Sequence, residues 1–237
     1  MKKIFEKYET IFCLLLIAIY ILVNMFCIQN FGTTDYRSVI VNTIFSLGLI
    51  CLMIALKRLE YYGIRKPINL KKNLYFIPLL VIAFVNLWGG INVNNSKSEI
   101  VFHILNMINI GFIEEVIFRG FLYKMMAKDN EKVAIIVSSI TFGIGHVVNL
   151  FNGAELIPTL LQMCSAITIG YLFVIIFNKS KSIIPCVVTH ILINSLSIFN
   201  NYNNLLLYIS SLVLIVFPIA YAIYLSVTIK DEKKIEE

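Results

Sequence analysis

The sequence has little charge and no extended polar segment. Only 14% of its 237 residues are Asp, Glu, Lys or Arg, whereas 59% are hydrophobic. Soluble domains usually carry about 25% charged residues, so this composition excludes an ordinary soluble domain. The five cysteines stand singly within hydrophobic runs and show no CxxC spacing. They are therefore expected to be free, buried thiols, and no disulfide framework is predicted.

Long hydrophobic runs fill most of the chain instead. Most are close to the roughly 20 residues that span the hydrocarbon core of a bilayer. The eight runs are Ile11–Ile28, Ser38–Leu56, Leu74–Ile91, Ile100–Met126, Val133–Phe151, Leu156–Phe177, Ser182–Phe199 and Leu205–Ile229. We therefore expect an all-α polytopic protein with eight transmembrane helices in one bundle, located in a cell membrane of the bacterial plasma-membrane type.

The cations are distributed unevenly between alternate loops. Of the 20 lysines and arginines, only Arg37 and Lys97 fall on the second side. The other 18 are Lys2, Lys3, Lys7, Lys57, Arg58, Arg65, Lys66, Lys71, Lys72, Arg119, Lys124, Lys128, Lys132, Lys179, Lys181, Lys230, Lys233 and Lys234. Such asymmetry predicts that both termini are cytoplasmic, which requires an even number of spans. The net charge of +6 is thus explained by topology and lipid headgroups, and no nucleic-acid partner is expected.

Two glutamates stand deep within the fourth hydrophobic run. A charge at mid-bilayer costs roughly 2.5–3.5 kcal/mol on insertion scales, so Glu114 and Glu115 are functional candidates. Arg119 follows Glu115 by four residues, on nearly the same helix face, and is expected to pair with it. Glu114 is rotated by about 100° from that face. We expect Glu115 and Arg119 to support the site and Glu114 to be available for chemistry.

Polar residues of the fifth and seventh runs are candidates to join Glu114. His190 and Asn194 are four residues apart and project from one helix face. His146 lies in the fifth run, and Phe142, four residues earlier, is expected to wall the same pocket. At about 1.5 Å of rise per residue, the four polar residues lie about 13–21 Å from the cation-bearing ends of their helices. Three helices can therefore converge on one site.

These residue types fit hydrolysis. Glu114 suits a general base that takes a proton from water, and His146 can orient or deprotonate that water. His190 and Asn194 can donate hydrogen bonds to a developing oxyanion. A zinc ion held by Glu114, His146 and His190 is chemically possible, but HExxH is absent, so no cofactor is firmly predicted. His103, near the outer mouth of the fourth run, is expected to be incidental.

Three stretches of the chain carry motifs in a fixed order on separate predicted helices. Residues 114–122 read EEVIFRGFL, residues 138–146 read SSITFGIGH, and residues 190–194 read HILIN after SIIP at 182–185. These patterns, EExxFRG, FxxxH and HxxxN, resemble those of the CPBP family of CAAX proteases and bacteriocin-processing intramembrane proteases, also called Abi. The resemblance covers roughly residues 100–196.

The resemblance implies an eight-helix intramembrane endopeptidase. Glu114 would be its catalytic glutamate and His146 the partner in activating water. His190 and Asn194 would stabilise the oxyanion, with the ion pair that follows Glu114 in support. Three regions are expected: helices one to three in 1–98, the catalytic core of helices four to seven in 99–199, and a last helix with a charged cytoplasmic tail in 200–237.

The interpretation is a membrane-embedded, glutamate-dependent peptidase that cleaves near the cytoplasmic side of the bilayer. Its partners would be membrane lipids and a peptide or lipidated-protein substrate, such as a prenylated CAAX protein, a bacteriocin leader or a peptide pheromone; a self-immunity role would be compatible. One alternative is a non-catalytic bacteriocin-immunity or binding membrane protein. Another is a proton- or cation-coupled transporter, although the paired repeats typical of transporters are absent from the sequence.

Overall fold

The computed structural model describes residues 2–68 and 75–229, with side chains from Phe5 onward. The start of the third hydrophobic run and several predicted cytoplasmic cations lie outside the described residues or side chains. These are Leu74, Lys2, Lys3, Lys71, Lys72, Lys230, Lys233 and Lys234. The described part of the chain is helical and contains no strand, which confirms the predicted all-α class.

The helices follow the hydrophobic runs closely. The first half comprises α1 (Lys2–Lys7), α2 (Glu9–Asn30), α3 (Tyr36–Ala55), α4 (Leu79–Ala83), the 3-10 turn η1 (Val85–Leu87) and α5 (Lys97–Glu115). A π-helix η2 (Val116–Tyr123) and α6 (Lys124–Met126) continue α5 without a break. The second half comprises α7 (Glu131–Ile144), η3 (Gly145–Val147), α8 (Val148–Phe151), α9 (Leu156–Ser180), α10 (Ile184–Leu196), η4 (Ser197–Phe199) and α11 (Asn204–Thr228).

Six continuous helical segments are long and apolar enough to cross a membrane, among the described residues. They are Glu9–Asn30, Tyr36–Ala55, Lys97–Met126, Glu131–Phe151, Leu156–Ser180 and Asn204–Thr228. The third predicted run does not form one long helix, since its described residues contain only the five-residue helix α4, Leu79–Ala83, and the 3-10 turn η1. The seventh run gives a shorter apolar helix, Ile184–Phe199. The predicted count of eight spans therefore stays a prediction.

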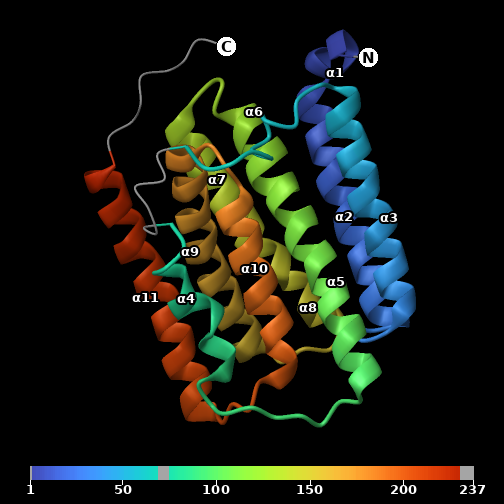
Figure 1. Cartoon of the computed structure of the whole chain (residues 1–237), viewed down its shortest axis with the longest axis vertical. Coiled ribbons are helices and arrows are strands. Elements are labelled where there is room, and N and C mark those ends of the chain that lie inside the picture. The colour runs from blue at the N-terminus through green and yellow to red at the C-terminus, as the bar shows by residue number, and fades with distance from the viewer. Residues whose placement is uncertain (1, 69–74, 230–237) are drawn as a thin grey trace.

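The described loops nevertheless lie at alternate ends of the bundle along the chain (Figure 1). The loops after α3, α6 and α9 lie at the upper end of the view, together with α1. The loops after α2, η1, α8 and η4 lie toward the lower end. The upper loops are those rich in lysine and arginine, so the loop alternation agrees with the charge pattern. The cytoplasmic placement of that end stays a prediction.

Close helix contacts form the core around the site. A Cβ on Gly143 of α7 would lie 2.8 Å from the backbone nitrogen of Ile167 in α9, so glycine permits these two backbones to approach. A Cβ on Gly111 of α5 would similarly lie 3.2 Å from the backbone nitrogen of Ile191 in α10. The expectation that all cysteines are buried is wrong for two of them, Cys51 and Cys164, which are exposed on the helix surface where lipid can cover an apolar thiol.

Candidate active site

The predicted pair of Glu115 and Arg119 is present and completely buried. The Arg119 Nη1 atom donates to Glu115 Oε1 at 3.0 Å, and neither side chain is exposed. The Arg119 guanidinium also lies over the Phe142 ring at 4.2 Å and near the Phe173 ring at 5.5 Å. These aromatic faces stabilise a cation that is removed from water. Arg119 is thus part of the site's interior, although the charge count placed it with the cytoplasmic cations.

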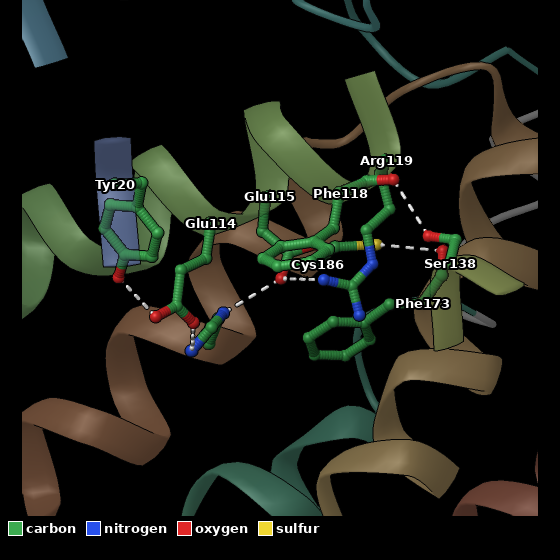
Figure 2. Close-up of polar contacts among 9 residues, drawn as sticks. Tyr20, Glu114, Glu115, Phe118, Arg119, Ser138, Phe173 and Cys186 are labelled. Atoms are coloured by element: carbon green, nitrogen blue, oxygen red, sulfur yellow. Dashed lines mark hydrogen bonds and ion pairs between the residues drawn. The ribbon is translucent and has the colours of Figure 1, made fainter. Parts of the chain in front are cut away.

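The turn that carries this pair is a π-helix. Residues Val116–Tyr123 follow directly on α5, and all eight are buried. The wider π turn alters the regular backbone hydrogen bonding, and such insertions are frequent at functional sites. Within this turn, the carbonyl oxygen of Phe118 accepts a hydrogen bond from Ser138 Oγ at 2.8 Å (Figure 2). The first motif is thereby tied to α7, the helix that leads into the second motif.

Glu114 faces away from this pair and meets a residue of α2. The hydroxyl of Tyr20 donates to Glu114 Oε1 at 2.5 Å, as Figure 2 shows. Glu114 retains 9% exposure, whereas Glu115 has none. The two adjacent carboxylates therefore have different donors and different access to space. Sequence analysis expected Glu114 to lack a neighbour on its own helix, and its partner comes from 94 residues away instead.

His190 of α10 connects the two carboxylates. Its Nδ1 atom lies 2.9 Å from Glu115 Oε1, and its Nε2 atom lies 3.4 Å from Glu114 Oε2. The polar contacts thus form a continuous chain from Tyr20 to Arg119, across α2, α5, α10 and η2.

Phe142 separates the two histidines of the second and third motifs. Its ring meets the His146 ring edge-on at 5.8 Å between centroids and the His190 ring edge-on at 5.7 Å. His146 lies in η3, just past the end of α7 at Ile144. Phe142 thus contacts both imidazoles as well as Arg119, which gives the predicted wall residue three packing partners within the site.

A cavity of about 490 Å³ opens beside Glu114. It is lined by all four residues expected to carry chemistry: Glu114, His146, His190 and Asn194. Phe142 lines it too. The structure therefore brings together the residues that sequence analysis grouped from three helices. Glu115 and Arg119 stand behind this wall, fully buried.

Two further residues of this site were not predicted as functional from the sequence. Tyr20 has no place in the three motifs, although a tyrosine inside a hydrophobic run needs a partner for its hydroxyl. His103 was expected to be incidental, yet it is buried at 5% exposure and lines the cavity. Its Nε2 atom lies 3.0 Å from the backbone oxygen of Asn194, and its Nδ1 atom lies 3.3 Å from Thr33 Oγ1. His103 therefore fixes the backbone of α10 next to a predicted oxyanion donor.

Among the described residues, no three His, Cys, Asp or Glu side chains are grouped closely enough to hold a metal ion. Glu114, His146 and His190, the alternative ligand set, line the same cavity. The Nδ1 atom of His190 is held by Glu115, and its Nε2 atom faces Glu114. The expectation that no metal is required stays a prediction.

Comparison with known proteins agrees with this geometry. Residues 96–196 match the family model described as "Type II CAAX prenyl endopeptidase Rce1-like". No curated protein and no solved structure matches the chain. The matched segment begins at the N-cap of α5 and ends with α10, so it contains η2, the Glu115–Arg119 pair and the three histidines that line the cavity. Together with the six apolar helices, the match identifies residues 96–196 of this multi-pass membrane protein as similar to the CPBP/CAAX protease family.

Proposed function

We propose that the protein is an intramembrane endopeptidase, expected in a bacterial plasma membrane, that hydrolyses a peptide bond with water activated by Glu114. The family match supports membrane protease activity in general. The observation that carries the finer proposal is the position of Glu114. Its carboxylate borders a cavity of about 490 Å³ that His146, His190 and Asn194 also line, while the second carboxylate is sealed behind it.

The division of labour follows from these surroundings. A water molecule in the cavity donates its proton to Glu114, and its oxygen attacks the carbonyl carbon of the substrate. His146 borders the same space and orients this water. The C–N bond then breaks, and the proton passes from Glu114 to the leaving amine nitrogen. Hydrolysis thus consumes one water and yields one carboxylic acid and one amine, which exchange a proton to become a carboxylate and an ammonium, with no net change at the enzyme.

The oxyanion that forms on the carbonyl oxygen needs hydrogen-bond donors. His190 and Asn194 line the same cavity, and removal of one such donor typically costs about 10²–10³ in kcat. The Nδ1 atom of His190 is held by Glu115, so its orientation is fixed before substrate arrives. Arg119 in turn holds Glu115. The buried pair thereby positions His190, and it makes no contact with the reacting atoms.

Replacement of Glu114 by Gln tests this mechanism, because glutamine keeps the side-chain volume and can still accept a hydrogen bond from Tyr20. Cleavage of a peptide library by the purified protein in detergent should fall by about 100-fold or more, as general-base loss predicts. The thermal midpoint should change little. Mass spectrometry of the products measures the rate and also locates the cleaved bond.

Glu155→Gln is the matched control, since Glu155 is an exposed glutamate at the start of α9 without a side-chain capping bond. It should retain full activity. Undiminished cleavage by Glu114→Gln would contradict the proposed mechanism. The zinc content of the same active preparation tests the metal alternative: about one zinc per active chain, lost in His146→Ala, would require a metal-based mechanism instead.

A further inference from the structure

The cavity extends from Glu114 toward one end of the bundle only. Its lining includes residues in or beside each of the four loops at the cation-poor end. Thr33 follows α2, Asn86 belongs to η1, Asn149 belongs to α8, and Asn200 and Tyr202 follow η4. These loops lie toward the lower end of the bundle in Figure 1. Among the described residues, none from the cation-rich loops after α3, α6 and α9 lines the cavity.

The other side of the site is filled by packed side chains. All eight residues of η2 are buried. Beyond them, Tyr62, from the loop after α3, is completely buried and stacks near Phe121 with 4.3 Å between ring centroids. Tyr123 packs against Phe177 of α9, with the centroids 5.8 Å apart. The path from Glu114 toward the cation-rich end is therefore closed by aromatic packing.

The chemistry of the cavity wall suits a polypeptide. Apart from its histidines, Glu114 is the only charged residue among the described residues that line it. Amides and hydroxyls continue from the site to the loops: Asn24, Ser165, Gln162, Asn149, Asn194, Ser197, Asn200, Ser210 and Ser211. Such neutral groups can donate to and accept from the N–H and C=O groups of an extended chain, which would otherwise be costly to bury.

We propose that the substrate enters from the cation-poor end, which the positive-inside rule places outside the cytoplasm. The substrate class is then a peptide segment presented on the extracytoplasmic side of the membrane, either exported or anchored by an adjacent hydrophobic stretch. The packed side chains of η2 and its neighbours lie between Glu114 and the cytoplasmic end of its helix. The short distance between Glu114 and that end therefore does not provide an access route. This inference rests on the proposed peptidase function and names the side from which its substrate arrives.

Sided membrane vesicles test this route directly. Vesicles of both orientations are given a charged, membrane-impermeant peptide that the detergent-solubilised protein cleaves, and vesicles with Glu114→Gln provide the background. Right-side-out vesicles should cleave the peptide at least 10-fold faster than inside-out vesicles, and detergent should abolish the difference. Faster cleavage by inside-out vesicles would overturn the proposal and favour a cytoplasmic substrate such as a prenylated C-terminus.

Cysteine labelling gives a second measurement that needs no catalysis. In a background with Cys51 and Cys164 replaced by Ser, Ser197→Cys places a thiol at an exposed cavity position. Asp129→Cys places one in the exposed loop after α6. An impermeant maleimide should label the first variant in intact cells and the second only after permeabilisation. A large maleimide on Ser197→Cys should also lower cleavage at least 10-fold relative to the same variant unlabelled.

The two measurements distinguish the failure of each proposal. If the detergent-solubilised protein cleaves no peptide, the peptidase proposal fails, while the labelling pattern still reports which end the cavity faces. If cleavage occurs but Ser197→Cys is labelled only after permeabilisation, the peptidase proposal stands and the extracytoplasmic route is wrong.

Discussion

Glu114 and Glu115 are neighbours in the chain, yet they face two different regions of the molecule. On the closed side, Glu115 is fully buried and is held by Arg119 and by His190 Nδ1. On the open side, Glu114 borders the cavity and is held by Tyr20 and by His190 Nε2. A rotation of about 100° along one helix thus separates a carboxylate used for structure from one available to water.

The comparison shows why the motif needs two acidic residues in succession. A single buried carboxylate paired with arginine would have no free face for chemistry, and a single carboxylate at the cavity would leave His190 without its second anchor. His190 links the regions, because each of its ring nitrogens contacts one glutamate. The closed side is therefore expected to control folding, and the open side to control activity.

Loss of the guanidinium should give the largest effect. Arg119→Leu leaves Glu115 as an uncompensated charge in a fully buried position, which typically costs about 3–5 kcal/mol. We expect the thermal midpoint in detergent and the yield of folded protein to fall together with activity. Arg37→Leu is the matched control, because Arg37 forms an exposed ion pair with Asp35, and exposed pairs contribute little.

A double variant separates charge from packing in this result. If the cost of Arg119→Leu comes from the orphaned carboxylate, Arg119→Leu combined with Glu115→Leu should recover part of the lost stability, because no buried charge remains unpaired. If the double variant is no more stable than the single one, the loss comes from the contacts of Arg119 with Phe142 and Phe173. A fully folded but inactive Arg119→Leu protein would instead assign Arg119 to the substrate site.

The closed side was the more predictable of the two regions. The spacing of Glu115 and Arg119 within one predicted helix is enough to pair them, because local geometry decides the contact. The contact between Tyr20 and Glu114 depends on how α2 packs against α5, and no periodicity within either segment contains that information. The catalytic grouping itself was predicted because motif order and helix depth place Glu114, His146 and His190 in one layer.

The same distinction holds for the fold. Six of the eight hydrophobic runs became helices of membrane-spanning length, since hydrophobic length is a local property. The third run forms only the short elements α4 and η1 among its described residues, and a polar residue in its interior contacts the rest of the protein. Asn86, in the middle of that run, donates to the backbone oxygen of Ile193 in α10 at 2.7 Å. Such tertiary hydrogen bonds stabilise a segment of short helical elements, whereas hydropathy alone predicts one continuous span.

A smaller effect is expected on the open side when only a hydroxyl is removed. Tyr20→Phe keeps the ring that packs near Phe45 but deletes the donor to Glu114. A hydrogen bond to a charged group contributes about 1.5–3 kcal/mol. If the Tyr20 hydroxyl holds Glu114 in its reactive position with this free energy, its loss raises the activation barrier by the same amount and lowers kcat by about 10-fold or more. Steady-state kinetics of peptide cleavage in detergent should show the fall in kcat with little change in KM.

Tyr221→Phe is the control for this variant, because the Tyr221 hydroxyl is buried in α11 and has no hydrogen-bond partner among the described residues. Its removal should leave both kinetics and the thermal midpoint unchanged. If Tyr20→Phe destabilises the protein as strongly as Arg119→Leu does, Tyr20 belongs functionally to the closed side, and the contrast between the two regions is wrong.

The smallest effect is expected far from both regions, at the exposed ion pair before α3. The Asp35 carboxylate accepts hydrogen bonds from the Arg37 side chain and backbone nitrogen, which lower the pKa of Asp35 from its ordinary value of 3.8 to about 2. A lowered folded-state pKa stabilises the fold above the ordinary value, and this contribution disappears as pH falls through about 2. Asp35→Asn should lower the thermal midpoint only slightly at pH 7, since asparagine can still cap the helix. The difference between wild type and variant should persist at pH 4 and shrink toward pH 2. A difference in thermal midpoint already absent at pH 4 would show that Arg37 does not hold the carboxylate ionised. A loss of thermal midpoint as large as that of Arg119→Leu would mean that burial does not explain the different stability contributions of the two ion pairs.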